Sequence, residues 1–424
     1  MKNPVISPSS PQSFEYPPSQ IRNVHGNGAI TVSPRGIATG NSHYLNDGAA
    51  FGPDSVVGGL PGETGTPRTI TGGWAEAIAY ASAGSRLVST GVGTVDWGGT
   101  LLTIKKPLYI DMAGLTISNG ALEINHVVGD FLHSPSGILQ NVTLKGSPSA
   151  YAALARVACK YHIIKNVVIT TPGGVGFQEA STLQPDNAGV SYNNVGSAIN
   201  VYSAASDAFQ IITGGESGSG DGCNDNYYYA IGLENGSAAG LRILGLPGIT
   251  SPQTAGNQFY GLLTQNFAIG VHLSAGQNNS IDGWWSEANT NDLYVDDVSG
   301  LLGNRLKMVY PTTPSALNVV NNSNSFAATL RYPERVGFKA PGTYGAFLVG
   351  GVPTAGTGVA QNTNLFPVRV LMTGPTSGGV VTDAQTGTTW DTADDSVVLY
   401  AGDKISFSTA SPASWLWEDL GGGI

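Results

Sequence analysis

The chain has 424 residues, of which 59 are glycine and 11% are charged, less than half of the roughly 25% that is usual in a soluble domain. Its excess of glycine and small polar residues suits turns and β-strands, which excludes an all-α bundle or coiled coil. The net charge of −10 and the lack of any basic cluster larger than Lys105-Lys106 exclude a general nucleic-acid binder. No apolar run is long enough to predict a membrane span.

Residues 1–43 are rich in proline, serine and asparagine, a composition that predicts an extended arm rather than a folded unit. The segment contains no continuous apolar region, so we expect no secretory signal peptide. The polar, weakly charged composition is nevertheless typical of extracellular proteins. A virion protein released by lysis satisfies both observations, and so does a secreted protein whose leader has been removed.

Residues 44–100 are predicted to form an entry segment that contains one helix. Its apolar residues recur at the spacing of one helical face: Trp74, Ala77, Ile78 and Ala81. Thr71 is placed to cap the start of this helix, and Gly84 is placed to end it.

Residues 101–312 contain a repeat of short alternating strands punctuated by glycine and asparagine. The segment Asn257-Gln-Phe-Tyr-Gly aligns with Asn279-Ser-Ile-Asp-Gly and then with Asn304, at offsets of 22 and 25 residues. Asn141 and Asn166 are again 25 residues apart. Periods of about 20–50 residues indicate a solenoid. The composition excludes helical repeats, so the pattern predicts a parallel β-helix with an apolar interior and asparagine ladders at the turns.

The repeat ends after residue 312. Residues 313–340 are predicted to be a linker, and residues 341–424 are predicted to form a separate unit. Four apolar strands are predicted there at a spacing of roughly ten residues: 366–372, 396–400, 404–408 and 415–417. Glycine, proline and aspartate separate them, which predicts a small antiparallel β-sandwich or jelly roll. The predicted fold class is therefore all-β, a right-handed parallel β-helix followed by this sandwich.

Three parts of the chain carry a resemblance to a known family. They are the entry segment Asn46-Asp-Gly-Ala-Ala-Phe with Gly72-Gly-Trp-Ala-Glu-Ala-Ile, the segment Trp285-Ser-Glu-Ala-Asn-Thr-Asn-Asp-Leu-Tyr, and the C-terminal Leu399-Tyr-Ala-Gly-Asp-Lys-Ile-Ser-Phe. Together they resemble the pectate-lyase-like tailspikes and tail fibres of bacteriophages. The resemblance implies a homotrimer in the virion tail, docked on other tail or baseplate proteins through the N-terminal arm. It also implies a cell-surface polysaccharide as the partner of the C-terminal unit or the β-helix.

Glycan cleavage on such a scaffold needs two carboxyl groups, about 5–5.5 Å apart for retaining and about 6.5–9.5 Å apart for inverting hydrolysis. The first candidate set of catalytic carboxylates is Glu216, Asp221 and Asp225, with Glu234 on the strand that follows. These residues surround a loop rich in glycine and serine. The competing interpretation is that they are solvated turn residues.

The second candidate set is Asp282 and Glu287, with Asp292 nearby, beside the tryptophans Trp284 and Trp285. Aromatic rings stack on sugars, so both tryptophans are candidate glycan-binding residues. Their alternative role is to stack inside the β-helix. Two further candidates are Trp415 and Trp417, which either bind glycan or belong to the core of the sandwich.

No cofactor or metal is expected. The loop 218–226 is rich in oxygen ligands of the kind that Ca²⁺ prefers, but it matches no known calcium motif, and a plain insertion is the favoured interpretation. The two cysteines, Cys159 and Cys223, are too few for a disulfide framework or a zinc site. Buried free thiols are favoured over a single bridge.

Three functions fit these observations. The first is a virion tail fibre or tailspike that binds a host-surface glycan. The second is a polysaccharide depolymerase, a glycoside hydrolase or lyase, on the same scaffold. The third is a secreted bacterial polysaccharide lyase.

Overall fold

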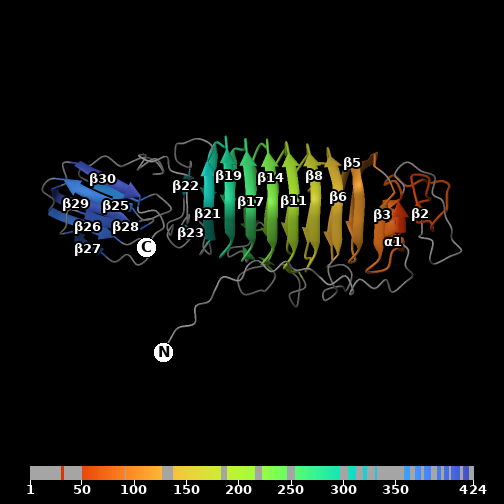
Figure 1. Cartoon of the computed structure of the whole chain (residues 1–424), viewed down its shortest axis with the longest axis horizontal. Coiled ribbons are helices and arrows are strands. Elements are labelled where there is room, and N and C mark those ends of the chain that lie inside the picture. The colour runs from red at the N-terminus through yellow and green to blue at the C-terminus, as the bar shows by residue number, and fades with distance from the viewer. Residues whose placement is uncertain are drawn as a thin grey trace, which may run out of the picture.

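The computed structural model of the protein describes seventeen segments of the chain: residues 30–32, 50–90, 92–126, 137–182, 189–214, 222–245, 254–296, 304–311, 319–321, 330–331, 358–362, 368–373, 377–382, 389–392, 396–400, 403–410 and 414–419. Within them the regular structure is β-strand, apart from the helix α1 (Trp74–Tyr80) (Figure 1). None of the helical structure in these segments is long and apolar enough to cross a membrane.

The chain enters its main sheet through three short parallel strands, β1 (Ile30–Val32), β2 (Ala50–Phe51) and β3 (Arg86–Ser89). β1 pairs with both β2 and β3, so part of the segment expected to be a free arm belongs to the sheet.

The predicted helix is confirmed as α1, and its apolar face is buried. Thr71 supplies the expected cap, because the backbone N–H of Ala75 donates to its Oγ1 at 3.0 Å. The helix ends at Tyr80 and not at Gly84, because Ala81 already has an extended backbone with ψ 138°.

Two long columns of parallel strands make up most of the sheet, and a short third column lies beside them. The first column contains β4 (Thr94–Ile104), β5 (Tyr109–Asn125), β6 (Ile138–Lys145), β8 (Ile163–Thr170), β11 (Val195–Tyr202), β14 (Tyr227–Glu234), β17 (Gln258–Gln265), β19 (Ser280–Glu287), β21 (Asn304–Pro311) and β23 (Leu330–Arg331). The second contains β7 (Leu154–Val157), β9 (Phe177–Ala180), β12 (Phe209–Thr213), β15 (Ala239–Gly245), β18 (Ile269–Leu273), β20 (Asn291–Val295) and β22 (Val319–Asn321). The C-terminal part of β5 pairs with β7, so β5 also belongs to the second column. The third contains β10 (Ser191–Tyr192), β13 (Cys223–Asn224) and β16 (Thr254–Ala255).

From β8 to β17 the chain visits the three columns in turn, and each strand pairs in parallel with its counterpart one circuit later. This cyclic order is consistent with the expected β-helix. β22 and β23 pair with β20 and β21, so the parallel sheet continues into residues 313–340, which were expected to be a linker.

The predicted asparagine ladder is confirmed in the interior. The side-chain amides of successive circuits are joined by Nδ2–Oδ1 hydrogen bonds of 2.9 to 3.0 Å from Asn226 through Asn257 and Asn279 to Asn304. The offsets of 22 and 25 residues hold for the last two steps. The preceding steps, from Asn194 to Asn226 and on to Asn257, are 32 and 31 residues, so the circuits differ in length.

Each long strand from β6 to β19 bends at its middle through one residue with a positive φ: Asn141, Asn166, Ala198, Ala230, Gly261 and Gly283. Such a residue interrupts the two-residue alternation of side chains. Leu139 and Val142 of β6 therefore both face inward although they are three residues apart. The two halves of a long strand present two different outer faces.

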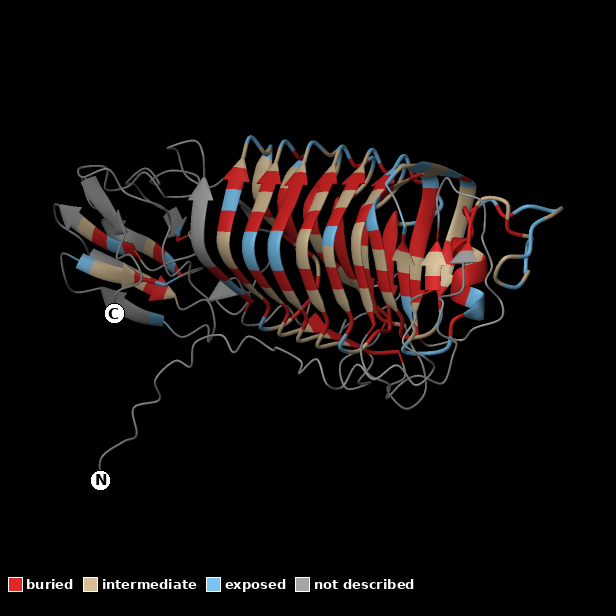
Figure 2. Ribbon diagram, turned by 45° about the vertical axis from the view of Figure 1, so that its right-hand side comes forward, coloured by how far each residue is buried: buried red, intermediate tan, exposed pale blue. Residues whose placement is uncertain are grey.

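The interior between the columns is filled by ladders of buried side chains, and on either side of each bend buried positions alternate with intermediate or exposed ones (Figure 2). An aromatic stack runs through several circuits, with ring centroids 4.6 Å apart for Phe177 and Phe209 and for Tyr228 and Phe259. Gly196 makes room for it, because a Cβ there would lie 2.8 Å from the Tyr228 ring.

A buried ion pair lies among these side chains. Arg156 and Glu179 are fully buried neighbours in register on β7 and β9, with Nη2 and Oε2 2.5 Å apart. Tyr228 donates to Glu179 Oε2 at 3.0 Å, Ser191 donates to Oε1, and Asn194 Nδ2 donates to Oε1 at 3.3 Å. These partners compensate for the desolvation of the two charges.

The C-terminal strands form two antiparallel sheets, as the sequence predicted in outline. One sheet contains β24 (Gly358–Gln361), β29 (Lys404–Ala410), β26 (Ser377–Thr382) and β27 (Thr389–Thr392). The other contains β28 (Ser396–Leu399), β25 (Val368–Thr373) and β30 (Ser414–Asp419). Buried aliphatic residues come from both: Val368, Val370, Val381, Leu399 and Ile405.

Candidate functional site

The first candidate set of carboxylates is divided by the structure. Glu216 and Asp221 lie outside the described residues. Asp225 lies at the corner that follows β13 and has φ 51°, a left-handed conformation that aspartate and asparagine tolerate. Burial raises the pKa of its carboxyl group. Glu234 lies at the opposite end of β14, so the length of that strand separates it from Asp225.

Asp225 belongs to a stack of equivalent corners. Asn193 and Asn278 occupy the same corner in other circuits and have the same left-handed backbone, with φ 53° at both. Asp225 is therefore a corner residue of the fold. This position favours the interpretation as a turn residue over that as a catalytic carboxylate.

In the second candidate set, one tryptophan proves to be internal. Trp284 is fully buried, and its indole Nε1 donates to Thr264 Oγ1 at 3.0 Å. Its assignment as a glycan-binding residue is wrong, because a ring enclosed in the interior cannot stack on a sugar. The next residue, Trp285, faces outward and is 48% exposed, and its Nε1 donates to Glu287 Oε2 at 3.3 Å.

The bend at Gly283 divides the two carboxylates of this set. Asp282 precedes the bend and Glu287 follows it, so they lie on different outer faces of β19. Each carboxylate is accompanied by an aromatic group on its own face. The arrangement therefore offers two places to hydrogen-bond a sugar hydroxyl, and it does not form the pair that hydrolysis needs.

Two exposed tyrosines complete this surface. Tyr229, Tyr260 and Asp282 occupy the same register position on β14, β17 and β19. The tyrosine rings stack with centroids 5.2 Å apart and planes 10° from parallel, and each residue is 38% exposed. The Tyr260 hydroxyl donates to Gln258. Burial raises the pKa of both tyrosines, and a neighbour adds to each shift, Tyr260 at Tyr229 and Asp282 at Tyr260.

We call this surface the aromatic tract: Tyr229, Tyr260, Asp282, Trp285 and Glu287. Sequence reasoning identified its tryptophan and its carboxylates but missed both tyrosines. A signal for them exists, because each of Tyr229, Tyr260 and Asp282 follows a ladder asparagine by three residues.

For the two C-terminal candidate tryptophans the structure describes the backbone alone. Trp415 and Trp417 lie in β30, where they pair with Met372 and Val370 of β25. Their side chains lie outside the described part of the chain, so their role in glycan binding stays a prediction.

Both cysteines are buried free thiols, as expected. Burial raises the pKa of each thiol. Ser191 pairs with Cys223, and Tyr192 pairs with Lys160, so the Ser191 strand lies between the two cysteines. Two strand spacings of about 4.8 Å exceed the Cα separation of about 7 Å that a disulfide allows.

Across the described residues, no group of three or more His, Cys, Asp and Glu side chains could hold a metal ion. Comparisons with protein-family models, with curated proteins and with solved structures found no significant match.

Proposed function

We propose that the protein is a virion tail-fibre or tailspike component that attaches to a host by binding a cell-surface glycan through the aromatic tract. Its parallel part is a right-handed β-helix and its two antiparallel sheets form a C-terminal β-sandwich. The cyclic pairing of the three columns supports the β-helix, and the resemblance of the entry and C-terminal segments supports the virion role.

The observation that carries the proposal is the stacked pair Tyr229 and Tyr260, exposed and in register with Asp282. Each ring of the pair keeps one face that the other ring does not cover. Such an aromatic face offers the apolar face of a sugar ring a place to stack, and a neighbouring carboxylate accepts hydrogen bonds from its hydroxyls. Trp285 and Glu287 repeat the same combination on the adjacent face. Two such positions favour a polymeric glycan over a single sugar.

The separation of the carboxylates favours binding over hydrolysis. Asp282 and Glu287 lie on different faces, and Asp225 is a corner residue away from both. The N-terminal arm would dock on other tail proteins, and a homotrimer would cover the ends of the sheet, which otherwise present unpaired strands.

The test is binding of the purified full chain to a panel of immobilised bacterial capsular and lipopolysaccharide O-chain polysaccharides. We expect at least one polysaccharide to bind, and Tyr260→Ala and Trp285→Ala each to weaken that binding by about tenfold. The magnitude is taken by analogy with nucleic-acid bases, whose stacking on an aromatic side chain contributes about 1–3 kcal/mol. Tyr80→Ala, which removes an exposed tyrosine from α1, is the matched control.

Reducing-end release is measured on the same polysaccharides, together with the molecular mass by light scattering. A trimer of 43.6 kDa chains that binds and releases nothing agrees with the proposal. Oligosaccharide release would replace it with the depolymerase, and an unchanged affinity in both tract variants would remove the tract as the binding surface.

A further inference from the structure

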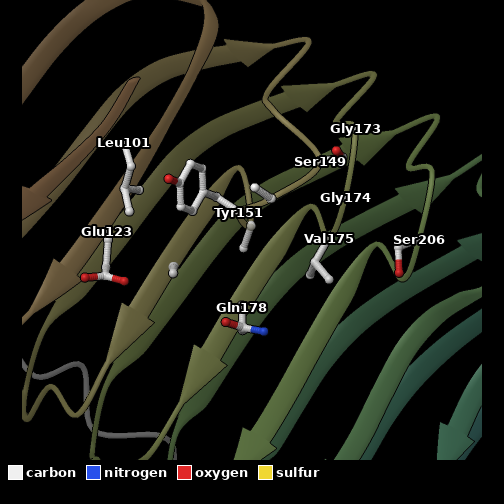
Figure 3. A pocket seen from close by; sticks show the side chains of 12 residues that line it. Leu101, Glu123, Ser149, Tyr151, Gly173, Gly174, Val175, Gln178 and Ser206 are labelled. Carbon is white, nitrogen blue, oxygen red and sulfur yellow. The ribbon is translucent and has the colours of Figure 1, made fainter. Parts of the chain in front are cut away.

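A pocket separate from the aromatic tract opens on the outer side of the second column. It has a volume of about 510 Å³, and Figure 3 shows the Tyr151 ring on one side of it with Glu123 and Gln178 across from the ring. This volume lies within the range of about 300–1,000 Å³ that small-molecule sites occupy.

The strand register explains why the pocket is there. Glu123, Ala155 and Gln178 are directly paired neighbours on β5, β7 and β9. Adjacent strands are about 4.8 Å apart, so a small residue on the middle strand leaves a gap between the two longer side chains. One circuit further on the gap is closed, because Gln178 Nε2 donates to Gln210 Oε1 at 3.0 Å.

The wall beyond Gln178 is held in place by hydrogen bonds. Gln210 Nε2 donates to Asp207 Oδ2 at 2.7 Å, and Asp207 Oδ1 accepts from the backbone N–H of Ala239 at 3.0 Å. Gln178 therefore presents its amide from a fixed position. The remaining polar lining includes the Ser149 and Ser206 side chains.

The charge of the pocket indicates which kind of ligand it would bind. Among its twelve lining residues, Glu123 is the one carboxylate, and none is a lysine, arginine or histidine. Glu123 Oε1 accepts a hydrogen bond from Asn125 Nδ2 at 3.3 Å. Asn125 is neutral, so this hydrogen bond does not neutralise the negative charge of the carboxylate. Tyr151 is 41% exposed, and an aromatic face attracts cations.

We propose that this pocket binds an amino sugar that carries a free, protonated amino group. The ammonium lies between the Glu123 carboxylate and the Tyr151 ring, and the sugar body occupies the space above Ala155. The Gln178 amide and the Ser206 hydroxyl hydrogen-bond the ring hydroxyls. An N-acetylated sugar loses the charge that Glu123 recognises and is a poorer ligand. The inference uses no residue of the aromatic tract, so either can fail without the other.

The experiment is isothermal titration of the full chain at pH 6 with three probes: the glucosamine trisaccharide, its fully N-acetylated counterpart and trilysine. The proposal expects the glucosamine trisaccharide to bind about tenfold or more tightly than either of the others. Equal binding of the acetylated trisaccharide would overturn the role of the ammonium group. Equal binding of trilysine would reduce the pocket to a general cation site and overturn the assignment to a sugar.

Two variants test the location. Glu123→Gln removes the charge at nearly constant shape, and Ala155→Gln fills the gap while extending the amide ladder of Gln178 and Gln210. Each is expected to lower the affinity for the glucosamine trisaccharide by about tenfold or more, whereas Glu234→Gln on another face leaves it within about twofold. Unchanged affinity in Glu123→Gln would overturn the proposal, whether or not Ala155→Gln folds.

Discussion

The interior asparagine ladder makes a quantitative prediction at Asn257. Its Oδ1 accepts from the backbone N–H of Asn226 at 3.2 Å and from the Asn226 side-chain Nδ2 at 2.9 Å. Its own Nδ2 donates to the carbonyl of Cys223 at 2.8 Å and to Asn279 Oδ1 at 2.9 Å. The residue is fully buried, so water cannot replace these partners.

Replacing Asn257 with alanine leaves two donors without a partner. These are the backbone N–H of Asn226 and one of its two Nδ2 hydrogens, since the other donates to the Ser191 carbonyl at 3.3 Å. The two acceptors each retain another hydrogen bond. Asn279 Oδ1 still accepts from the backbone N–H of residue 257, and the Cys223 carbonyl still accepts from the Thr254 hydroxyl. An unsatisfied buried donor costs about 1–3 kcal/mol, so Asn257→Ala should lower the free energy of unfolding by about 2–6 kcal/mol.

The assay is urea unfolding at pH 7 followed by far-ultraviolet circular dichroism, with refolding checked by dilution. Asn200→Ala is the matched control, because Asn200 lies on the outer face of β11 and is half-buried. It should change the free energy of unfolding by less than about 0.5 kcal/mol. A loss below about 1 kcal/mol in Asn257→Ala, or an equal loss in both variants, would refute the reasoning.

Three further predictions concern buried groups. Glu179→Gln should lower the free energy of unfolding by about 3–5 kcal/mol, because it leaves the Arg156 charge buried without its counter-charge; a loss near zero in urea unfolding would contradict this. Burial lowers the pKa of His126 to about 4, so the unfolded chain binds the proton first and stability falls as the pH drops from about 6.5 toward 4. At pH 5 His126 accounts for about 2 kcal/mol of the loss in the free energy of unfolding. In urea unfolding curves, His126→Gln should therefore lose less stability between pH 6.5 and 5 than the unchanged chain. An identical pH dependence in the two proteins would contradict this prediction. Cys159 and Cys223 should resist maleimide in the folded protein and both react in urea, and rapid labelling without urea would contradict their burial.

The parts of the fold that sequence could predict are those with a strong local signal. The asparagines of the last circuits repeat at a short interval, and α1 has one clear apolar face. The circuits from β8 to β17 do not follow this interval, because they are 31 to 32 residues long. The continuation of the parallel sheet into β22 and β23 carries no repeat signal at all, because these strands have only three and two residues.

The candidate site was predicted only in part, and the bend at Gly283 explains why. Strict alternation from the buried Ile281 would place Trp285 inside and Trp284 outside. Gly283, which precedes both tryptophans, has a left-handed backbone and reverses this order. The tyrosine stack depends on the register of β14 and β17, and the Glu123 pocket depends on a small residue between two distant segments. Neither relation is visible until the strands are paired.

The central claim is that glycan binds on the aromatic tract, and the most direct measurement is a crystal structure with an oligosaccharide from the best-binding polysaccharide of the panel. We predict a sugar ring stacked on the uncovered face of Tyr229 or Tyr260, with hydroxyls hydrogen-bonded to Asp282. An oligosaccharide bound elsewhere, with both tyrosine rings still open to solvent, would contradict it.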